Sequence, residues 1–89
     1  MKTIADFKQA MTVGSKWIFT AHWWPEPIAR TCMVSDSVKF GLTSPKDPQK
    51  TSYCDWPKKA EVLALTENSI TIRGEGFPEY HFLTYTQID

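Results

Sequence analysis

The sequence shows almost no imbalance of charge. Ten Lys and Arg residues balance ten Asp and Glu residues over 89 positions, so the formal net charge is zero. General nucleic-acid binders are strongly basic and mimics of DNA are strongly acidic, which excludes both classes. Only two of the cations, Arg30 and Arg73, are arginines. Because arginine is the residue that most often reads base edges, specific base recognition is disfavoured as well.

Long apolar runs are also missing. No segment has the roughly 20 apolar residues needed to cross a bilayer, and residues 1–8 lack the apolar run and cleavage site of a signal peptide. We therefore expect a soluble cytoplasmic protein with no membrane partner. The two cysteines, Cys32 and Cys54, do not form a CxxC pair. In a reducing compartment we expect both to remain free thiols.

The length favours a single domain over residues 1–89, because a chain this short has no room for two hydrophobic cores. Thr3 and Asp6 have the spacing of a capping box, which predicts the start of a helix. Ile4, Phe7 and Met11 then share one helical face. A short helix is therefore expected over residues 4–11, ending before Gly14.

The remaining chain, residues 15–87, has the pattern of a β-barrel. Aromatic and β-branched residues dominate segments separated by turn signals, and there is no βαβ unit. Pro25 and Pro27 predict a loop that does not continue a central strand. The clearest strands are expected over 16–22, 28–35, 38–42, 62–66, 69–73 and 80–86. The predicted fold class is mainly β, a small SH3-like antiparallel barrel of about five to six strands with a short N-terminal helix; an OB-like barrel is the alternative.

Large aromatic rings are the strongest functional signal, because four Trp, three Tyr and five Phe exceed what so small a core needs. Trp23 and Trp24 lie in the proline-stiffened loop, and Tyr53 and Trp56 lie in a short strand over 51–56 that precedes a further proline. These four rings could form a rigid platform for a partner protein, a proline-rich peptide or stacked bases. The alternative is that the tryptophans fill the ends of the barrel.

Charge is uneven along the chain although its sum is zero. Residues 39–59 contain five lysines against two aspartates, whereas residues 61–89 contain one arginine against five acidic residues. Lysines beside aromatic rings are typical of a weak single-stranded nucleic-acid site. Lysines that only solvate a loop and block edge pairing are the alternative. The candidate binding lysines are Lys46, Lys50, Lys58 and Lys59.

Three hypotheses about function follow. The leading one is a non-enzymatic module that binds a macromolecular partner, in the first place a protein, through the four rings and nearby lysines. The second is a weak single-stranded nucleic-acid binder that uses the same residues. The third is a small enzyme that uses Cys32 or Cys54 with His22 or His81. No motif supplies an orienting acid, close metal ligands or a phosphate loop, so we expect no enzyme, no metal and no cofactor.

Three short motifs carry a resemblance to known proteins. The run 13–17 (VGSKW), the turn 56–58 (WPK) and the segment 83–85 (LTY) resemble small uncharacterised β-barrel proteins encoded by phages and other mobile elements. Such proteins have no agreed activity, so no functional residue is carried over. The resemblance implies an accessory protein that binds and redirects a host macromolecule, including inhibitors of bacterial defence.

Overall fold

The computed structural model describes residues 1–22, 24–73 and 82–88, with the side chains of residues 24 and 25 left out. The prediction of a mainly β fold with one short helix is confirmed, and the described residues form seven strands where about five to six were expected. The elements are α1 (Ile4–Ala10), β1 (Lys16–Ala21), β2 (Trp24–Ser35), β3 (Lys39–Thr43), β4 (Thr51–Asp55), the 3-10 turn η1 (Lys59–Glu61), β5 (Val62–Leu65), β6 (Ser69–Arg73) and β7 (Phe82–Ile88). No helix in this part of the chain is long and apolar enough to span a membrane.

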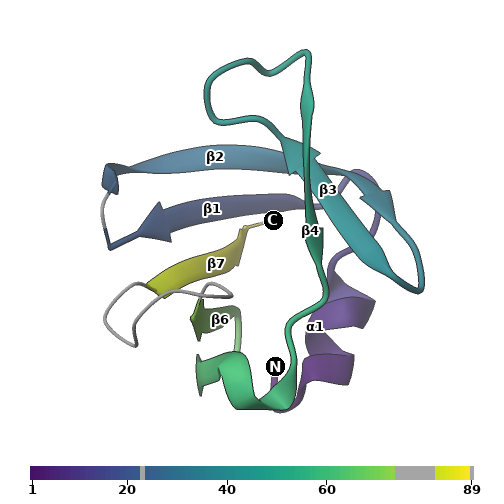
Figure 1. Cartoon of the computed structure of the whole chain (residues 1–89), viewed down its shortest axis with the longest axis vertical. Helices are drawn as coiled ribbons and strands as arrows, with labels where there is room; N and C mark the ends of the chain where they lie inside the picture. Colours follow the sequence, from purple (N-terminus) through teal and green to yellow (C-terminus); the bar gives the residue numbers. More distant parts are fainter. Residues whose placement is uncertain (23, 74–81, 89) are drawn as a thin grey trace.

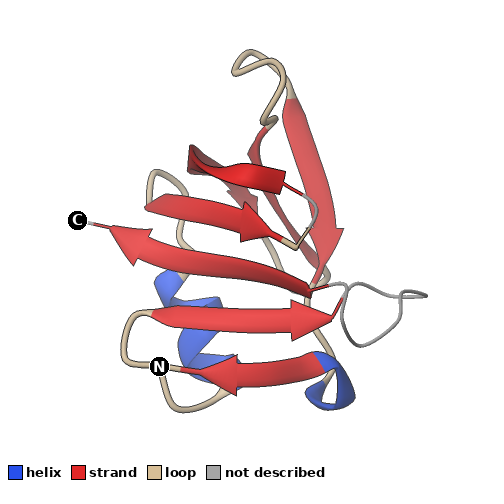
Figure 2. Ribbon diagram, turned by 90° about the vertical axis from the view of Figure 1, so that its left-hand side faces the viewer, coloured by secondary structure: helices blue, strands red, loops and turns tan. Residues whose placement is uncertain are grey.

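All seven strands belong to one antiparallel sheet with the order β4-β3-β2-β1-β7-β6-β5. The chain first forms a meander from β1 to β4 and then a second one from β5 to β7. The pairing of β7 beside β1 joins the two meanders. The sheet curls into a half-barrel, and β4 and β5 are its two edges (Figure 1, Figure 2).

The start of α1 is fixed by the capping box that the sequence predicts. The Thr3 hydroxyl accepts a hydrogen bond from the Asp6 amide at 3.2 Å, and the Asp6 carboxylate accepts from the Thr3 amide at 3.1 Å. The helix ends at Ala10, one residue earlier than expected. Gly14 then adopts φ +94°, a conformation that residues with a side chain rarely take. The chain can therefore turn directly from α1 into β1.

An aromatic cluster at the concave side of the sheet forms the centre of the core. The fully buried ring of Phe7 on α1 lies 5.6 Å from Trp17, 5.7 Å from Phe40, 5.8 Å from Trp56 and 6.3 Å from Tyr85, measured between ring centres. Three of these contacts are edge-to-face, the arrangement that ring quadrupoles favour. One helical side chain thus connects α1 to β1, β3, β7 and the segment after β4.

The prediction of a loop around Pro25 and Pro27 was wrong. The second strand begins at Trp24, not at residue 28, so Pro25 and Pro27 lie within β2. The register of the β1–β2 pair shifts between Phe19 and Ala21, opposite the prolines. A proline removes a ladder hydrogen bond, and a bulge is one of the few places in a sheet that tolerates this loss.

Candidate functional site

The edge strand β4 presents backbone groups that have no neighbouring strand in the described part of the chain. The Ser44 amide donates to the Lys50 carbonyl at 2.8 Å, and the β3–β4 register continues without a shift from that pair. Because hydrogen-bonded pairs alternate along an antiparallel ladder, Ser52 and Cys54 bond to β3. The amide and carbonyl groups of Thr51, Tyr53 and Asp55, the alternate residues of β4, therefore point away from β3.

A pocket of about 280 Å³ lies between this edge and the strands on the other side of the half-barrel. We call it the seam pocket. Its floor comes from three apolar or aromatic side chains of β6 and β7, and charged groups stand around it. Its lining consists of Cys54, Asp55, Trp56, Pro57, Lys58, Glu61, Ile72, Arg73, Leu83 and Tyr85.

Tyr85 places a polar group at the floor of the seam pocket. Its hydroxyl lies 3.9 Å from the Cys54 sulfur, and only 1% of the residue is exposed. Burial, reinforced by the neighbouring Cys54, raises the pKa of Tyr85 far above its ordinary value, and Arg30 partly opposes this. At neutral pH the phenol therefore stays protonated, and it offers a hydrogen-bonding group rather than a base.

Arg30 is a buried cation next to this floor. Only 4% of the residue is exposed, and its Nε donates to the Thr43 carbonyl at 2.7 Å. The guanidinium carbon lies 5.0 Å from the centre of the Phe19 ring, a cation–π distance. One terminal nitrogen of the guanidinium has no hydrogen-bond partner among the described residues. Arg30 thus brings a positive charge close to Tyr85 inside the half-barrel.

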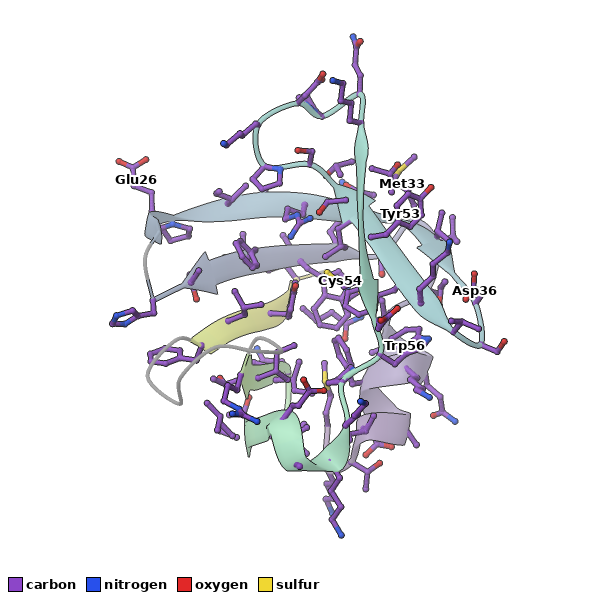
Figure 3. The ribbon with its side chains drawn as sticks, in the orientation of Figure 1. Glu26, Met33, Asp36, Tyr53, Cys54 and Trp56 are labelled. Atoms are coloured by element: carbon purple, nitrogen blue, oxygen red, sulfur yellow. The ribbon has the colours of Figure 1, made fainter. Side chains whose placement is uncertain are left out.

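Tyr53 stands on the outer face of the same edge strand and is 55% exposed. It lies opposite Gly41, where a Cβ atom would come within 3.1 Å of the tyrosine ring and 2.7 Å of the Thr51 methyl group. Glycine at this position therefore lets the ring lie against the backbone of β3. The Lys39 ammonium lies 4.8 Å from the ring centre. Met33, also exposed, lies on the same side of the sheet (Figure 3).

Trp56 lies on the opposite, inner side of the segment. Its ring centre is 4.7 Å from that of Phe40, and its indole nitrogen donates to the Asp36 carbonyl at 2.7 Å. Half-buried Trp56 is therefore partly core and partly a wall of the seam pocket. Trp23 and the Trp24 side chain lie outside the described residues. Of the four predicted rings, the two that are described sit on different faces of the chain around β4 (Figure 3).

The four predicted lysines lie in two groups. Lys46 and Lys50 belong to the β3–β4 loop, whereas Lys58 and Lys59 lie at η1, beyond the other end of β4 (Figure 1). All four are exposed, and one of them, Lys58, lines the seam pocket. The loop pair and the η1 pair do not form one continuous patch.

The three described residues of the enzyme hypothesis, Cys32, Cys54 and His22, lie on different elements of the fold. Cys32 is buried in β2, where burial raises the pKa of its thiol, and Cys54 is half-buried in β4; both are free. His22 lies in the turn after β1, with its ring 5.7 Å from that of Phe82, and His81 lies outside the described residues. Within the described ranges, no three His, Cys, Asp or Glu side chains form a group that could hold a metal ion.

Apart from Trp56 and Lys58, the residues that line the seam pocket were not among the predicted binding residues, and neither was Arg30 beside it. Arg30 has the same parity in β2 as half-buried Ile28 and buried Cys32. The two-residue period of a strand was the available signal that the Arg30 side chain points inward.

Comparison of the chain with protein-family models, with curated proteins and with solved structures finds no match to any of them.

Proposed function

We propose that this protein is a non-enzymatic binding module that accepts an extended segment of a partner protein along the open edge of β4. The observation that carries the proposal is the combination of outward backbone groups at Tyr53 and Asp55 with an apolar-floored pocket beside them. Strand addition of this kind draws affinity from main-chain hydrogen bonds. Specificity comes from pockets that take alternate side chains.

The dimensions of the site fit a chain rather than a cofactor. An added strand lies about 4.8 Å from its neighbour, and its side chains alternate between the two faces. Next to β4, one set of side chains points toward the seam pocket and the other set lies beside Tyr53. The pocket, at about 280 Å³, falls just under the roughly 300–1,000 Å³ typical of small-molecule sites. It has room for one or two apolar side chains.

The charges around the seam pocket favour a polypeptide over a nucleic acid. Asp55 and Glu61 stand beside Lys58 and Arg73 in its lining, so the rim carries both signs. A phosphate backbone needs a continuous positive surface, and affinity for it falls steeply with salt. A peptide that carries charges of both signs matches this rim. The partner is therefore expected to be a protein, and binding is expected to depend only weakly on salt.

We further propose that the sheet is an elaborated SH3-like barrel. In support, β1 to β4 form a meander and the last strand, β7, returns beside the first. The β5–β6 hairpin is then an addition that lengthens one edge. The resemblance to accessory proteins of phages and mobile elements supports a host protein as the natural partner.

Selection from a random peptide library on the immobilised protein tests the proposed function. Two variants separate main-chain from side-chain recognition. Tyr53→Ala removes the ring alone, whereas Tyr53→Pro removes the ring and the outward amide. Because that amide does not bond to β3, proline at this edge position is compatible with the sheet. Circular dichroism and thermal unfolding first establish that both variants are folded.

The expected result is a family of extended peptides with an apolar residue at alternate positions. Their binding should survive Tyr53→Ala with at most a modest loss and should be abolished by Tyr53→Pro. Equal binding to folded Tyr53→Pro, or failure of the library to yield any peptide, contradicts strand addition. A single-stranded oligonucleotide that binds more tightly than the selected peptides, with a steep salt dependence, would favour the nucleic-acid hypothesis instead.

A further inference from the structure

A second hollow lies between α1 and the other edge of the sheet. It has a volume of about 520 Å³ and shares no residue with the seam pocket. We call it the helix–β5 groove. It lies where the first turn of α1 approaches η1 and β5, and its lining consists of Lys2, Thr3, Ile4, Ala5, Lys59, Val62 and Leu65.

The walls of this groove are mostly apolar. Ile4 and Ala5 come from α1, and Val62 and Leu65 come from β5. Ile4, Val62 and Leu65 are only half-buried, so part of each side chain remains open to a ligand. A largely apolar hollow with a few polar groups is the usual form of a small-molecule site, and this volume falls within the range of such sites.

The charged side chains in the lining are all positive. Lys2 and Lys59 each contribute an ammonium group, and none of the described residues that line the groove is acidic. The nearest carboxylates in sequence do not line the groove, and hydrogen bonds from the backbone hold them in place without removing their negative charge. Asp6 accepts from the amides of Lys2 and Thr3, and Glu61 accepts from the amide of Lys58. The lining of the groove therefore combines apolar walls with two ammonium groups and no carboxylate.

We propose that the helix–β5 groove binds one medium-chain fatty carboxylate, with its alkyl chain against Ile4, Ala5, Val62 and Leu65 and its head group near Lys2 and Lys59. An apolar cavity of roughly 150 Å³ holds benzene. A groove of about 520 Å³ therefore has room for a chain of about ten carbons. The two ammonium groups select an anionic head over a neutral or cationic one.

The site is independent of the seam pocket, so the two proposals fail separately. The test is a titration of ¹⁵N-labelled protein with sodium decanoate, kept below the concentration at which it forms micelles, followed by amide chemical shifts. Decyltrimethylammonium, which has the same alkyl chain and the opposite charge, is the matched ligand control. We expect saturable shifts at residues 2–5, 59, 62 and 65 with decanoate and at least tenfold weaker binding of the cationic analogue.

Two sets of variants complete the test. Ala5→Leu fills the groove with a residue that favours helix, so α1 is retained, and we expect at least a tenfold loss of affinity. Gln9→Leu adds the same side chain to an exposed position of α1 outside the groove and should leave binding unchanged.

Charge is tested in the same way with glutamine substitutions. Lys2→Gln combined with Lys59→Gln should weaken decanoate binding about fivefold, because the variant loses two exposed ion pairs between an ammonium group and the carboxylate head, and each such pair contributes little. The matched pair Lys46→Gln and Lys50→Gln in the β3–β4 loop should have no effect. Three results would overturn the proposal: no localised shifts, equal affinity for the cationic analogue, or full binding by folded Ala5→Leu. Binding to anionic vesicles without binding of monomeric decanoate would assign the groove to a membrane surface and also reject it.

Discussion

Replacement of Phe7 by alanine should remove a large part of the stability of the fold. Its ring is fully buried and contacts four other aromatic rings, in β1, in β3, in β7 and after β4. Phe→Ala substitutions in cores cost about 3–5 kcal/mol, and each aromatic pair adds about 0.5–1.5 kcal/mol beyond the area it buries. We expect Phe7→Ala to cost about 4 kcal/mol. A chain of 89 residues has a total stability of roughly 4–13 kcal/mol, so this variant should lie near the limit of folding.

Urea unfolding followed by tryptophan fluorescence measures this loss, since Trp17 and Trp56 both contact Phe7. Phe7→Leu keeps an apolar side chain at the centre of the cluster and should cost about half as much. Gln9→Ala, on the exposed side of α1, is the matched control and should change stability by less than about 0.5 kcal/mol. A cost below about 1 kcal/mol for Phe7→Ala would show that α1 does not anchor the half-barrel.

Three further predictions concern pH and packing. The pKa of Tyr85 is raised in the folded state, so the contribution of the protonated phenol to stability is complete below pH 10 and is lost as the pH rises further. The free energy of unfolding, measured between pH 8 and 11.5, should therefore fall with pH for the wild type and should not show this fall for Tyr85→Phe. Gly41→Ala should destabilise by about 1–3 kcal/mol, because its methyl group would meet the Thr51 methyl at 2.7 Å, and Thr51→Ser should recover part of that loss in urea unfolding. Hydrogen bonds from the amides of Lys2 and Thr3 lower the pKa of Asp6. The wild type should therefore be more stable than Asp6→Asn above pH 4, and this difference should vanish as the pH falls toward 2. A difference in stability that does not change with pH would refute the role given to the Asp6 carboxylate.

Local signals in the sequence predicted the helix and most strands, because those signals act over a few residues. The capping box at Thr3 and Asp6 was confirmed, as was the end of the helix before Gly14. The expected strand over 69–73 coincides with β6, where Ile70 and Ile72 point inward as their alternation predicts. The prediction of a loop around Pro25 was wrong because a register shift in the pairing of β2 with the preceding strand, β1, accommodates the prolines within β2.

The candidate site could not be assembled from the sequence, since it depends on which strands become neighbours. Contacts between distant segments bring β7 beside β1, and this pairing leaves β4 at an edge of the sheet. Sequence proximity grouped Tyr53 with Trp56, but strand alternation and the contact of Trp56 with Phe40 place the two rings on different faces. The candidate lysines, which are near one another in sequence, form two pairs at opposite ends of β4 (Figure 1).

Amide hydrogen exchange along β4 tests the open edge most directly, and it needs no partner. The account predicts an alternating pattern, in which the amides of Ser52 and Cys54 exchange slowly and those of Tyr53 and Asp55 exchange fast. Addition of a selected peptide should protect Tyr53 and Asp55 as well. Slow exchange of Tyr53 and Asp55 in the free protein would mean that this edge is already covered, and it would contradict the proposed binding mode.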